Sequence, residues 1–493
     1  MKNIKLSLFL LLSGVFVVSC NDAIDITQPG EMLPETTFET VEDLQKGLYA
    51  VYATIPAEGG IYFTSVFTDE TAIGRSNGGQ GVTYLQHILN STSSPSGIWT
   101  GNYRAINFAN RLIEAADLVT VEDGEEETFT HIVAQAHAVR ALCHLQLMTY
   151  YAVDMKDNNA LGVIKLDFVP TTTDFLPRNT VGEVFDLIHA DLDYADANLN
   201  PAESNRGLFR KPVITALKAR VEAYRGNYAQ AGTYANDVIT TSGLTLSTPT
   251  VYKNIFVDLD NGEVIFKLIR NAANVSGANF YQVWSSVNAS PSGSPFLEVN
   301  RALFNLVDIP TDVRRDVITY TGAGNEIHPD YTSLDLGDYI NQDVLPVFKY
   351  STSKGVPLLG DIKVIRLSEM YLIRAESKVT NDLAGAAADV HAVRVARNPA
   401  AAMPTYANQQ QAWADILKER RVEFAFEGHR YIDLKRLGNL AGVQSNRDSR
   451  DSAEQGYPET MSNDDYRYTL PIPMSEMTVN PNIRSQQNPG YND

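Results

Sequence analysis

Small residues recur at helical spacing in residues 212–239, and this pattern constrains the fold more than any other feature of the chain. The segment predicts two helices joined by a short turn at residues 224–228 (YRGNY). The small residues are Ala216, Ala219 and Ala223 in the first helix and Ala231 and Ala235 in the second. Because small side chains let helices approach closely, we predict an antiparallel helix pair of the kind found in helical repeats.

Two further helix pairs are predicted, and together they indicate a mainly α body. Residues 365–395 carry small and apolar residues at helical spacing on either side of a short polar turn. Residues 134–147 and 181–199 form the third pair, and the second of these helices begins at a capping box of Thr180 and Glu183. The predicted pairs are not contiguous, so other structure interrupts the helical repeat.

Two long stretches lack this periodicity. Residues 56–98 contain glycine pairs and a run of serines. Residues 241–360 are rich in Gly, Pro, Ser, Asn and aromatic residues, with a short strand-like run at 264–266. Both stretches are predicted as irregular insertions, and loops of this length in a compact protein are usually functional. Residues 37–493 are therefore interpreted as one mainly α domain with long loop-rich insertions and few short strands.

The N-terminus carries a secretion signal. Two lysines precede an apolar run at residues 6–18, which is too short to span a bilayer. The residues just before Cys20 are small or branched, as in bacterial lipoprotein signals. We predict a signal peptide over residues 1–19, acylation of Cys20 (including palmitate) and a polar tether over residues 20–36. An ordinary cleaved signal with an incidental cysteine is the alternative.

Composition narrows the possible partners. The chain carries 59 acidic and 40 basic residues, a formal net charge of −19. This balance argues against nucleic acid and against electrostatic attachment to anionic lipid. Of the two cysteines, only Cys143 remains once Cys20 is acylated, which leaves no disulfide and no cysteine-ligated metal. The apolar neighbours of Cys143 predict a buried thiol.

Signals for metal or cofactor chemistry are weak. The chain has no phosphate loop and no H-E-x-x-H motif. His131, His137 and His144 stand six and seven residues apart without a carboxylate nearby in the sequence, so we predict satisfied or exposed histidines. Residues 258–263 (DLDNGE) resemble a calcium loop only in part, and a polar turn explains them. We expect no cofactor and no enzymatic activity.

The densest charged pattern lies in residues 418–436 (KERRVEFAFEGHRYIDLKR). Glu419, Glu423 and Glu427 share one face of a predicted helix, with arginines beside them, and alternating charges follow Gly428. A structural ion-pair network and an active site are both compatible with this pattern. We favour the network, because alternating charges satisfy one another and leave no unpaired group.

Five segments carry motifs that occur together in one known family. They are residues 366–376 (RLSEMYLIRAE), 393–397 (VRVAR), 419–436 (ERRVEFAFEGHRYIDLKR), 470–476 (LPIPMSE) and 487–491 (QNPGY). In this order they resemble the SusD/RagB family of outer-membrane nutrient-binding lipoproteins. The second segment departs from the family pattern by exchanging a small residue and an arginine. The resemblance spans nearly the whole mature chain.

The resemblance implies a fold and a partner. The fold is a body of four tetratricopeptide-like helix pairs with an irregular subdomain that carries the ligand surface. The partner is a TonB-dependent transporter barrel of the SusC type, over which such a lipoprotein sits at the cell surface. The resemblance also implies that nutrients, usually oligosaccharides and in some members peptides, are captured without covalent chemistry.

Six residues in or near the irregular stretches are candidate ligand contacts. Sugars stack on aromatic rings while amide and charged groups fix their hydroxyls, and loops are where such residues are expected. The candidates are Arg75 and Asn77 in the Gly-rich loop, Trp99 and Asn102 after the serines, and Tyr281 and Trp284 in the second insertion. Trp99 also has helical spacing to Tyr103, so packing in the core is an equal alternative for it.

Capture of oligosaccharides by a lipid-anchored protein of the outer membrane is the leading prediction. Capture of peptides is the alternative within the same family. A surface glycoside hydrolase would need two carboxylates at catalytic separation in a cleft. A repeat protein that only scaffolds other proteins is the remaining possibility.

Overall fold

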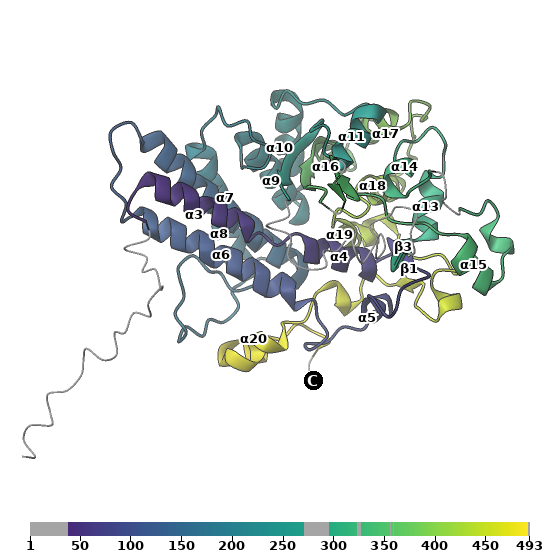
Figure 1. Ribbon diagram of the computed structural model, residues 1–493, viewed down its shortest axis with the longest axis horizontal. Helices are drawn as coiled ribbons and strands as arrows, with labels where there is room; N and C mark the ends of the chain where they lie inside the picture. Colours follow the sequence, from purple (N-terminus) through teal and green to yellow (C-terminus); the bar gives the residue numbers. More distant parts are fainter. Residues whose placement is uncertain (1–37, 271–294, 323–326, 355, 358, 492–493) are drawn as a thin grey trace, which may run out of the picture.

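The computed structural model describes residues 38–270, 295–322, 327–354, 356–357 and 359–491 (Figure 1). The predicted signal peptide, Cys20, the tether, Tyr281 and Trp284 lie outside the described residues. Helices dominate the described chain, and the strands are short. This confirms the predicted fold class.

The helices and strands have the following bounds. The N-terminal half contains α3 (Val41–Ala53), α4 (Glu58–Phe67), β1 (Thr71–Ile73), α5 (Val82–Leu85), α6 (Ser96–Ala116), α7 (Glu126–Tyr151), α8 (Val181–Asn198), α9 (Lys211–Tyr224), α10 (Tyr228–Thr241), α11 (Pro249–Phe256) and β2 (Val264–Leu268). The C-terminal half contains β3 (Leu297–Val299), α13 (Arg301–Val307), α14 (Arg315–Ile318), α15 (Leu336–Gln342), β4 (Thr352–Ser353), β5 (Val356–Pro357), β6 (Ile362–Arg366), α16 (Leu367–Lys378), α17 (Leu383–Arg397), α18 (Gln409–Glu423), α19 (Arg430–Ala441), β7 (Ser445–Asn446), β8 (Thr460–Met461) and α20 (Met474–Val479).

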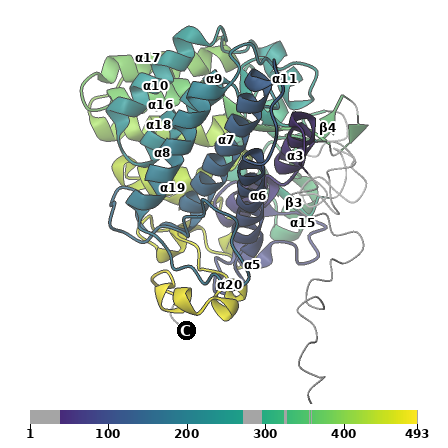
Figure 2. The same ribbon diagram turned by 90° about the vertical axis from the view of Figure 1, so that its left-hand side faces the viewer.

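Helices that are neighbours in the chain pack together in pairs. The pairs are α6 with α7, α7 with α8, α9 with α10, α16 with α17, and α18 with α19. Helix α10 also packs against α16, so two pairs far apart in the sequence lie side by side (Figure 2). All three predicted pairs are therefore confirmed. The capping box is present too: Thr180 Oγ1 accepts from the Glu183 backbone N–H, and Glu183 accepts from the Thr180 backbone N–H.

The predicted hairpin at 212–239 corresponds to α9 and α10. Ala219, Ala231 and Ala235 are buried, as close packing of two helices requires. The turn passes through Gly226, whose φ of 77° lies in the left-handed region that glycine adopts without a steric penalty. Small residues and a permissive turn therefore produce this pair.

The described core consists of two hydrophobic clusters. The larger cluster fills the space between the helix pairs. The smaller cluster lies among α11, α13, α14, β1 and β3. The described strands pair two by two, all antiparallel: β1 with β3, β2 with β6, β4 with β5, and β7 with β8. The strand-like run at 264–266 is thus confirmed as part of β2.

The prediction of loops throughout residues 56–98 is wrong, because this stretch contains α4, β1 and α5. Gly59 and Gly60 lie inside α4, which places Phe63 in the larger cluster and Val66 in the smaller one. A Cβ on Gly60 would lie 2.8 Å from the hydroxyl oxygen of Tyr150, so the close approach to α7 requires glycine there. Burial on two sides outweighs the low helix propensity of glycine.

The second predicted insertion also contains more helix than expected. Helices α11, α13, α14 and α15 lie within residues 241–360. They are short, and the first three pack their apolar residues into the smaller hydrophobic cluster. Tertiary packing stabilises such short helices, which would be marginal alone and leave little periodicity in the sequence.

Candidate functional site

Residues 74–81 form a tight loop after β1, and Asn77 holds it together. Its Nδ2 donates to the carbonyl oxygens of Gln80 (2.8 Å) and Phe296 (2.7 Å), and its Oδ1 accepts from the Gly79 N–H (2.9 Å). The Asn77 side chain is buried and fully used by the protein, so this placement does not support a ligand contact for it. Arg75 is half-buried in the same loop.

The same loop contains a letter match to a nucleophile motif. Residues 74–78 (GRSNG) fit the pattern G-x-S-x-G. That motif requires the serine on a sharp turn from a strand into a helix, with a histidine beside it. Here Ser76 leads into further turns before α5, and no described histidine hydrogen-bonds to it. The match therefore indicates no catalytic serine.

Two tyrosines beside this loop were missed in the sequence. Tyr62 and Tyr84 are half-buried, and their rings meet edge to face with centroids 6.4 Å apart. Gly81, at a φ of 70°, brings the loop against Tyr62, since a Cβ there would lie 3.0 Å from the Tyr62 hydroxyl oxygen. Burial raises the pKa of Tyr62 to about 12. The apolar run at residues 61–67 could have indicated a buried helix that contains Tyr62. The glycines before the run made this stretch look like a loop.

Trp99 and Asn102 lie in the first turns of α6 and face the interior. Trp99 is 1% exposed, and its ring packs against Tyr103 and Tyr151 at centroid distances of 4.8 and 4.9 Å. Its Nε1 donates to Glu476 Oε2 at 3.2 Å. Asn102 is fully buried, and its Nδ2 donates to the Ile98 carbonyl. Both side chains are therefore packed in the interior, as in the core-packing alternative for Trp99, while Trp99 also lines a groove along α6.

A groove of about 390 Å³ opens along α6, where the helix meets the 164–176 loop and α20. We call it the α6 groove. Its apolar walls are Trp99, Tyr103, Ile164, Leu166, Pro170 and Leu176. Its polar groups come from Thr100, Arg104, Asn107, Asp174, Glu476 and Asn480. Arg104 is exposed, whereas Tyr103 is anchored by hydrogen bonds of its hydroxyl to the Ile164 backbone.

Tyr281 and Trp284 lie outside the described residues, but the chain on either side of their segment is placed. The Arg270 guanidinium pairs with Glu58 at 2.7 Å. The carbonyl oxygen of Pro295 accepts from the Ser76 N–H at 3.2 Å. The two described residues that flank residues 271–294 thus both contact the first predicted insertion.

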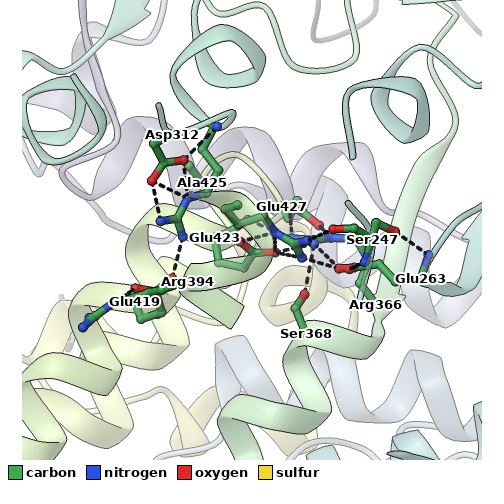
Figure 3. Close-up of polar contacts among 12 residues, drawn as sticks. Ser247, Glu263, Asp312, Arg366, Ser368, Arg394, Glu419, Glu423, Ala425 and Glu427 are labelled. Atoms are coloured by element: carbon green, nitrogen blue, oxygen red, sulfur yellow. Dashed lines mark hydrogen bonds and ion pairs between the residues drawn. The ribbon is translucent and has the colours of Figure 1, made fainter. Parts of the chain in front are cut away.

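The charged signature of residues 418–436 forms part of a buried ion-pair network, not a catalytic cleft (Figure 3). Arg366, at the end of β6, donates to Glu263 (2.9 Å), Glu423 (2.6 Å) and Glu427 (2.8 Å). Arg397 donates to Glu263 and Glu423 as well, at 2.7 and 2.8 Å. Burial alone would raise the pKa of Glu423, but Arg397 and Arg366 hold it well below its ordinary value. The predicted network is confirmed.

A second set of buried charges continues the network toward α16 and α19. Arg436 pairs with Glu376 (2.5 Å) and Asp433 (2.9 Å), and Arg420 donates to Asp433 at 2.8 Å. Burial opposes the charge of Asp433, yet Arg420 and Arg436 lower its pKa to about 2. These charges compensate one another and join helices that are distant in sequence.

The remaining candidates also have partners within the protein. His137 Nδ1 lies 2.6 Å from Asp191, a carboxylate that the distant helix α8 supplies, so His137 is satisfied as predicted. In the calcium-like stretch, Asp258 pairs with Lys363 and Glu263 with Arg366. Within the described ranges, no group of three or more His, Cys, Asp or Glu side chains is arranged to hold a metal. The Cys143 thiol is buried as predicted.

Burial raises the pKa of several carboxyl groups in the described chain, among them Glu298, Glu70 and Asp451. The pKa of Glu298 is raised to about 8, and those of Glu70 and Asp451 are raised to about 7. Glu298 accepts from the Leu345 N–H at 2.8 Å, and Asp451 accepts from the Arg301 N–H and the Tyr339 hydroxyl. None of them lines the α6 groove. Glu298 and Asp451 are bonded within the protein, so we interpret their role as structural.

Comparison with known proteins identifies relatives of the whole chain. A sequence model of the SusD family matches residues 316–491, and one described as starch-binding, associating with outer membrane, matches residues 25–221. SusD-like protein P2 of Formosa agariphila is 25% identical over 100% of this chain and 100% of that protein.

Solved structures share the fold. A putative sugar binding protein from Bacteroides vulgatus superposes with a TM-score of 0.76 at 24% identity, covering 92% of this chain and 100% of that one. Surface glycan-binding protein A from Bacteroides thetaiotaomicron, in complex with laminarihexaose, superposes with a TM-score of 0.68 at 19% identity, covering 90% and 98% of the two chains.

Proposed function

Because this chain belongs to the SusD/RagB family, we propose that it is a non-catalytic surface lipoprotein that captures oligosaccharides and passes them to a TonB-dependent, SusC-like transporter. Carbohydrate as the ligand class is supported by the fold neighbour that was solved with laminarihexaose. Association with the outer membrane follows from the description of the N-terminal family match.

The observation that carries the proposal is the composition of the α6 groove. Aromatic and aliphatic side chains form its walls, and a guanidinium, two amides and two carboxylates stand at its polar side. Apolar walls suit the C–H faces of a sugar, and the few polar groups suit its hydroxyls. Arg104 and Asn107 are one helical turn apart on α6, which places both beside the same ligand.

Two carboxylates in the α6 groove make hydrolysis the specific alternative. Asp174 and Glu476 both line it. However, hydrogen bonds from the Thr171 backbone and side chain lower the pKa of Asp174, so it stays ionised and is a poor general acid. Both oxygens of Glu476 already accept hydrogen bonds, from Trp99 and Asn480. Capture without turnover is the better supported function.

The anchor and the transporter belong to the same proposal. The apolar run before Cys20 supports lipidation of that residue and export of the chain. Along the described ranges, no helix combines the length and apolarity needed to span a bilayer. Delivery to a SusC-like barrel rests on the family resemblance, as does exposure at the cell surface.

The groove is tested by calorimetry with laminarihexaose, a panel of other oligosaccharides and a set of peptides. We expect an oligosaccharide to bind the mature protein and Arg104→Ala to weaken it about tenfold, the effect of losing one charge-assisted hydrogen bond. Lys46→Ala is the control, since the Lys46 side chain on α3 is 64% exposed, its ion pairs are with Glu42 and Asp43 of its own helix, and it does not line the groove. Binding of peptides alone would favour the alternative ligand class.

Trp284, Tyr281 and Arg75 remain proposed ligand contacts. Trp284→Ala should weaken glycan binding and leave the melting temperature nearly unchanged. If Trp284 were a core residue, the substitution would instead lower the unfolding free energy by about 3–5 kcal/mol. A large loss of stability with binding intact in the folded fraction would contradict the assignment.

Incubation of the mature protein with the bound oligosaccharide separates capture from hydrolysis. We expect no new reducing ends over the incubation, because no general acid is available in the α6 groove. Release of reducing ends that is lost in Asp174→Asn would establish the hydrolase instead.

A further inference from the structure

A second opening lies where α4, α7, α9, β6 and α19 meet. It has a volume of about 350 Å³, and we call it the central cleft. Its apolar walls are Ile61, Ile98, Leu142, Leu145, Ile362 and Ile432. A volume at the lower end of the range for ligand sites suits one small molecule.

Arg220 supplies the first polar group of the central cleft. The side chain lines the cleft although the residue is only 7% exposed. Its Nε and Nη2 donate to Glu369 (2.8 and 2.6 Å), and Nη2 also donates to the Val364 carbonyl (2.7 Å). Nη1 has no acceptor among the described residues, so two N–H groups of a rigidly held guanidinium remain available.

His429 supplies the second group from the N-terminus of α19. It is 6% exposed and lines the cleft. Its Nδ1 accepts from Arg420 Nη2 at 3.3 Å, which places the proton of the neutral ring on Nε2. Burial lowers the pKa of His429 to about 4, so the ring is neutral at pH 7. Nε2–H has no acceptor in the described part of the protein.

Gln146 and Tyr224 add two more groups from α7 and α9. Both side chains line the cleft, and neither the Gln146 amide nor the Tyr224 hydroxyl bonds to another described residue. Gln146 is half-buried, whereas Tyr224 is buried. Four side chains from three elements thus present unused hydrogen-bonding capacity to one space, and buried polar groups are normally satisfied.

The charges around the central cleft are balanced. Lys363 lines it but donates to Asp258 at 2.6 Å, and Glu427 lines it but accepts from Arg366 at 2.8 Å. Arg220 is neutralised by Glu369. An ion entering the cleft would lose its hydration without an unpaired counter-charge, so the cleft favours a neutral ligand.

We propose that the central cleft binds a single neutral sugar ring through Arg220, His429, Gln146 and Tyr224. This rests on the proposed carbohydrate function but names a different site, distinct in its lining from the α6 groove. The apolar walls contact the C–H faces of the ring. The donors from α7, α9 and α19 bind its hydroxyl oxygens.

Gly97 provides a way to close the cleft without disturbing the core. It is an exposed residue that lines the cleft, and a Cβ added there would meet no atom within 4 Å. Gly337 is the matched control. Each glycine is the second residue of its helix, each is exposed, and a Cβ on Gly337 would have only an ordinary contact of 3.6 Å with Asp335.

The test is calorimetry of the mature protein with D-glucose, D-galactose, D-mannose and D-xylose at millimolar concentrations. We expect at least one of them to bind, Gly97→Leu to abolish that binding, and Gly337→Leu to leave it unchanged. His429→Asn should weaken it about tenfold, because Asn retains an acceptor near the position of Nδ1 but lacks Nε2–H. Melting temperatures measured in parallel identify any variant that fails to fold.

Laminarihexaose separates this inference from the proposed function. Its binding should persist in Gly97→Leu and weaken in Arg104→Ala. If the hexaose binds but none of the four monosaccharides does, the central cleft holds solvent only and the inference is overturned while the proposed function stands. Monosaccharide binding that Gly97→Leu and His429→Asn leave unchanged would also overturn it. Monosaccharide binding with no oligosaccharide binding would support the cleft and contradict the proposed function.

Discussion

Arg366 illustrates how this protein accommodates many charges in its interior. All three of its nitrogens donate to protein acceptors, which include the carboxylates of Glu263, Glu423 and Glu427 and the hydroxyl of Ser368. A buried charge is tolerated when its partners are complete, and removing one partner leaves the others uncompensated. The individual residues of the network therefore stabilise the fold as a set.

Glu423→Gln should lower the unfolding free energy by about 3–5 kcal/mol, because it removes one of the two carboxylates that Arg366 and Arg397 share. Urea denaturation followed by circular dichroism measures the change. The control is Glu42→Gln, whose ion pair with Lys46 is on the surface with the Glu42 side chain 79% exposed, and which should change stability by less than about 0.5 kcal/mol. Equal effects of the two substitutions would contradict the structural role of the network.

Glu298 should make stability depend on pH. Burial raises its pKa to about 8 in the folded protein, with Asp451 and Asp343 adding repulsion, whereas its ordinary value is 4.5. The folded state therefore holds a proton that the unfolded chain releases. The stabilisation is fully present below about pH 4.5 and is lost as the pH rises toward 8, with a limiting slope of about 1.4 kcal/mol per pH unit.

Glu298→Gln isolates this effect, because Gln resembles the protonated acid and keeps an acceptor for the Leu345 N–H. We expect the variant to match the wild type at pH 4 and to exceed it increasingly between pH 5 and 8. Denaturation at each pH gives the difference, in which the other titrating groups cancel. A difference that does not change with pH would show that Glu298 is ionised in the folded state.

The α9–α10 hairpin is the clearest unit at the scale of elements. Small residues line the contact between the two helices, and Gly226 makes the turn. Helix α4 is the opposite case, because nothing local favours it and two hydrophobic clusters hold it. The α9–α10 hairpin is therefore determined by its local sequence, whereas helix α4 depends on the residues that pack around it.

Ala219→Leu should destabilise the hairpin by about 1–3 kcal/mol, since the larger side chain has no space in a fully packed site. Thermal unfolding measures it. Ala229→Leu on the neighbouring helix is the control, because Ala229 is exposed and leucine has a similar helix propensity. A neutral effect at Ala219 would mean that the two helices can separate to accept the side chain.

At the scale of the whole molecule, the helix pairs and the irregular part are held together at one junction. Helix α4 and the 424–427 turn contribute to both hydrophobic clusters, and the ion-pair network crosses the same region. The central cleft opens there as well. The body is thus continuous, and in the proposal its attachment to the membrane depends on the N-terminal lipid.

Cys20→Ala should release the protein from the membrane fraction, because two or more acyl chains are what give stable anchoring. Cell fractionation and labelling with radioactive palmitate measure the change. Cys143→Ala is the control, since that thiol is buried and cannot be acylated in the folded protein. Persistence of the Cys20→Ala protein in the membrane fraction would mean that a partner such as the transporter retains it.

Local patterns were sufficient for much of the fold. The alanine spacing predicted the α9–α10 pair, and the Thr180 capping box predicted the start of α8, since both depend on residues a few positions apart. The alternating charges of 418–436 predicted a network for a related reason: neighbouring opposite charges satisfy each other. The motif order also pointed to the family.

The site depended on contacts that no local pattern contains. Trp99 and Asn77 have the chemistry of ligand contacts, but residues far away in the chain, Tyr151, Glu476 and Phe296, already contact their polar and aromatic groups. Trp99 still lines the α6 groove. The carboxylate that pairs with His137 belongs to Asp191 on another helix, α8.

What the sequence alone determined is the helical body, its caps, its charged network and the family, because helical periodicity and pairing of close charges act over a few residues. The tertiary structure decided which polar groups are hydrogen-bonded within the protein and which remain available to a ligand. Burial makes α4 a helix despite its glycines, and it brings Arg220, His429 and Gln146 from three elements to one cleft, because only packing sets distances between segments so far apart.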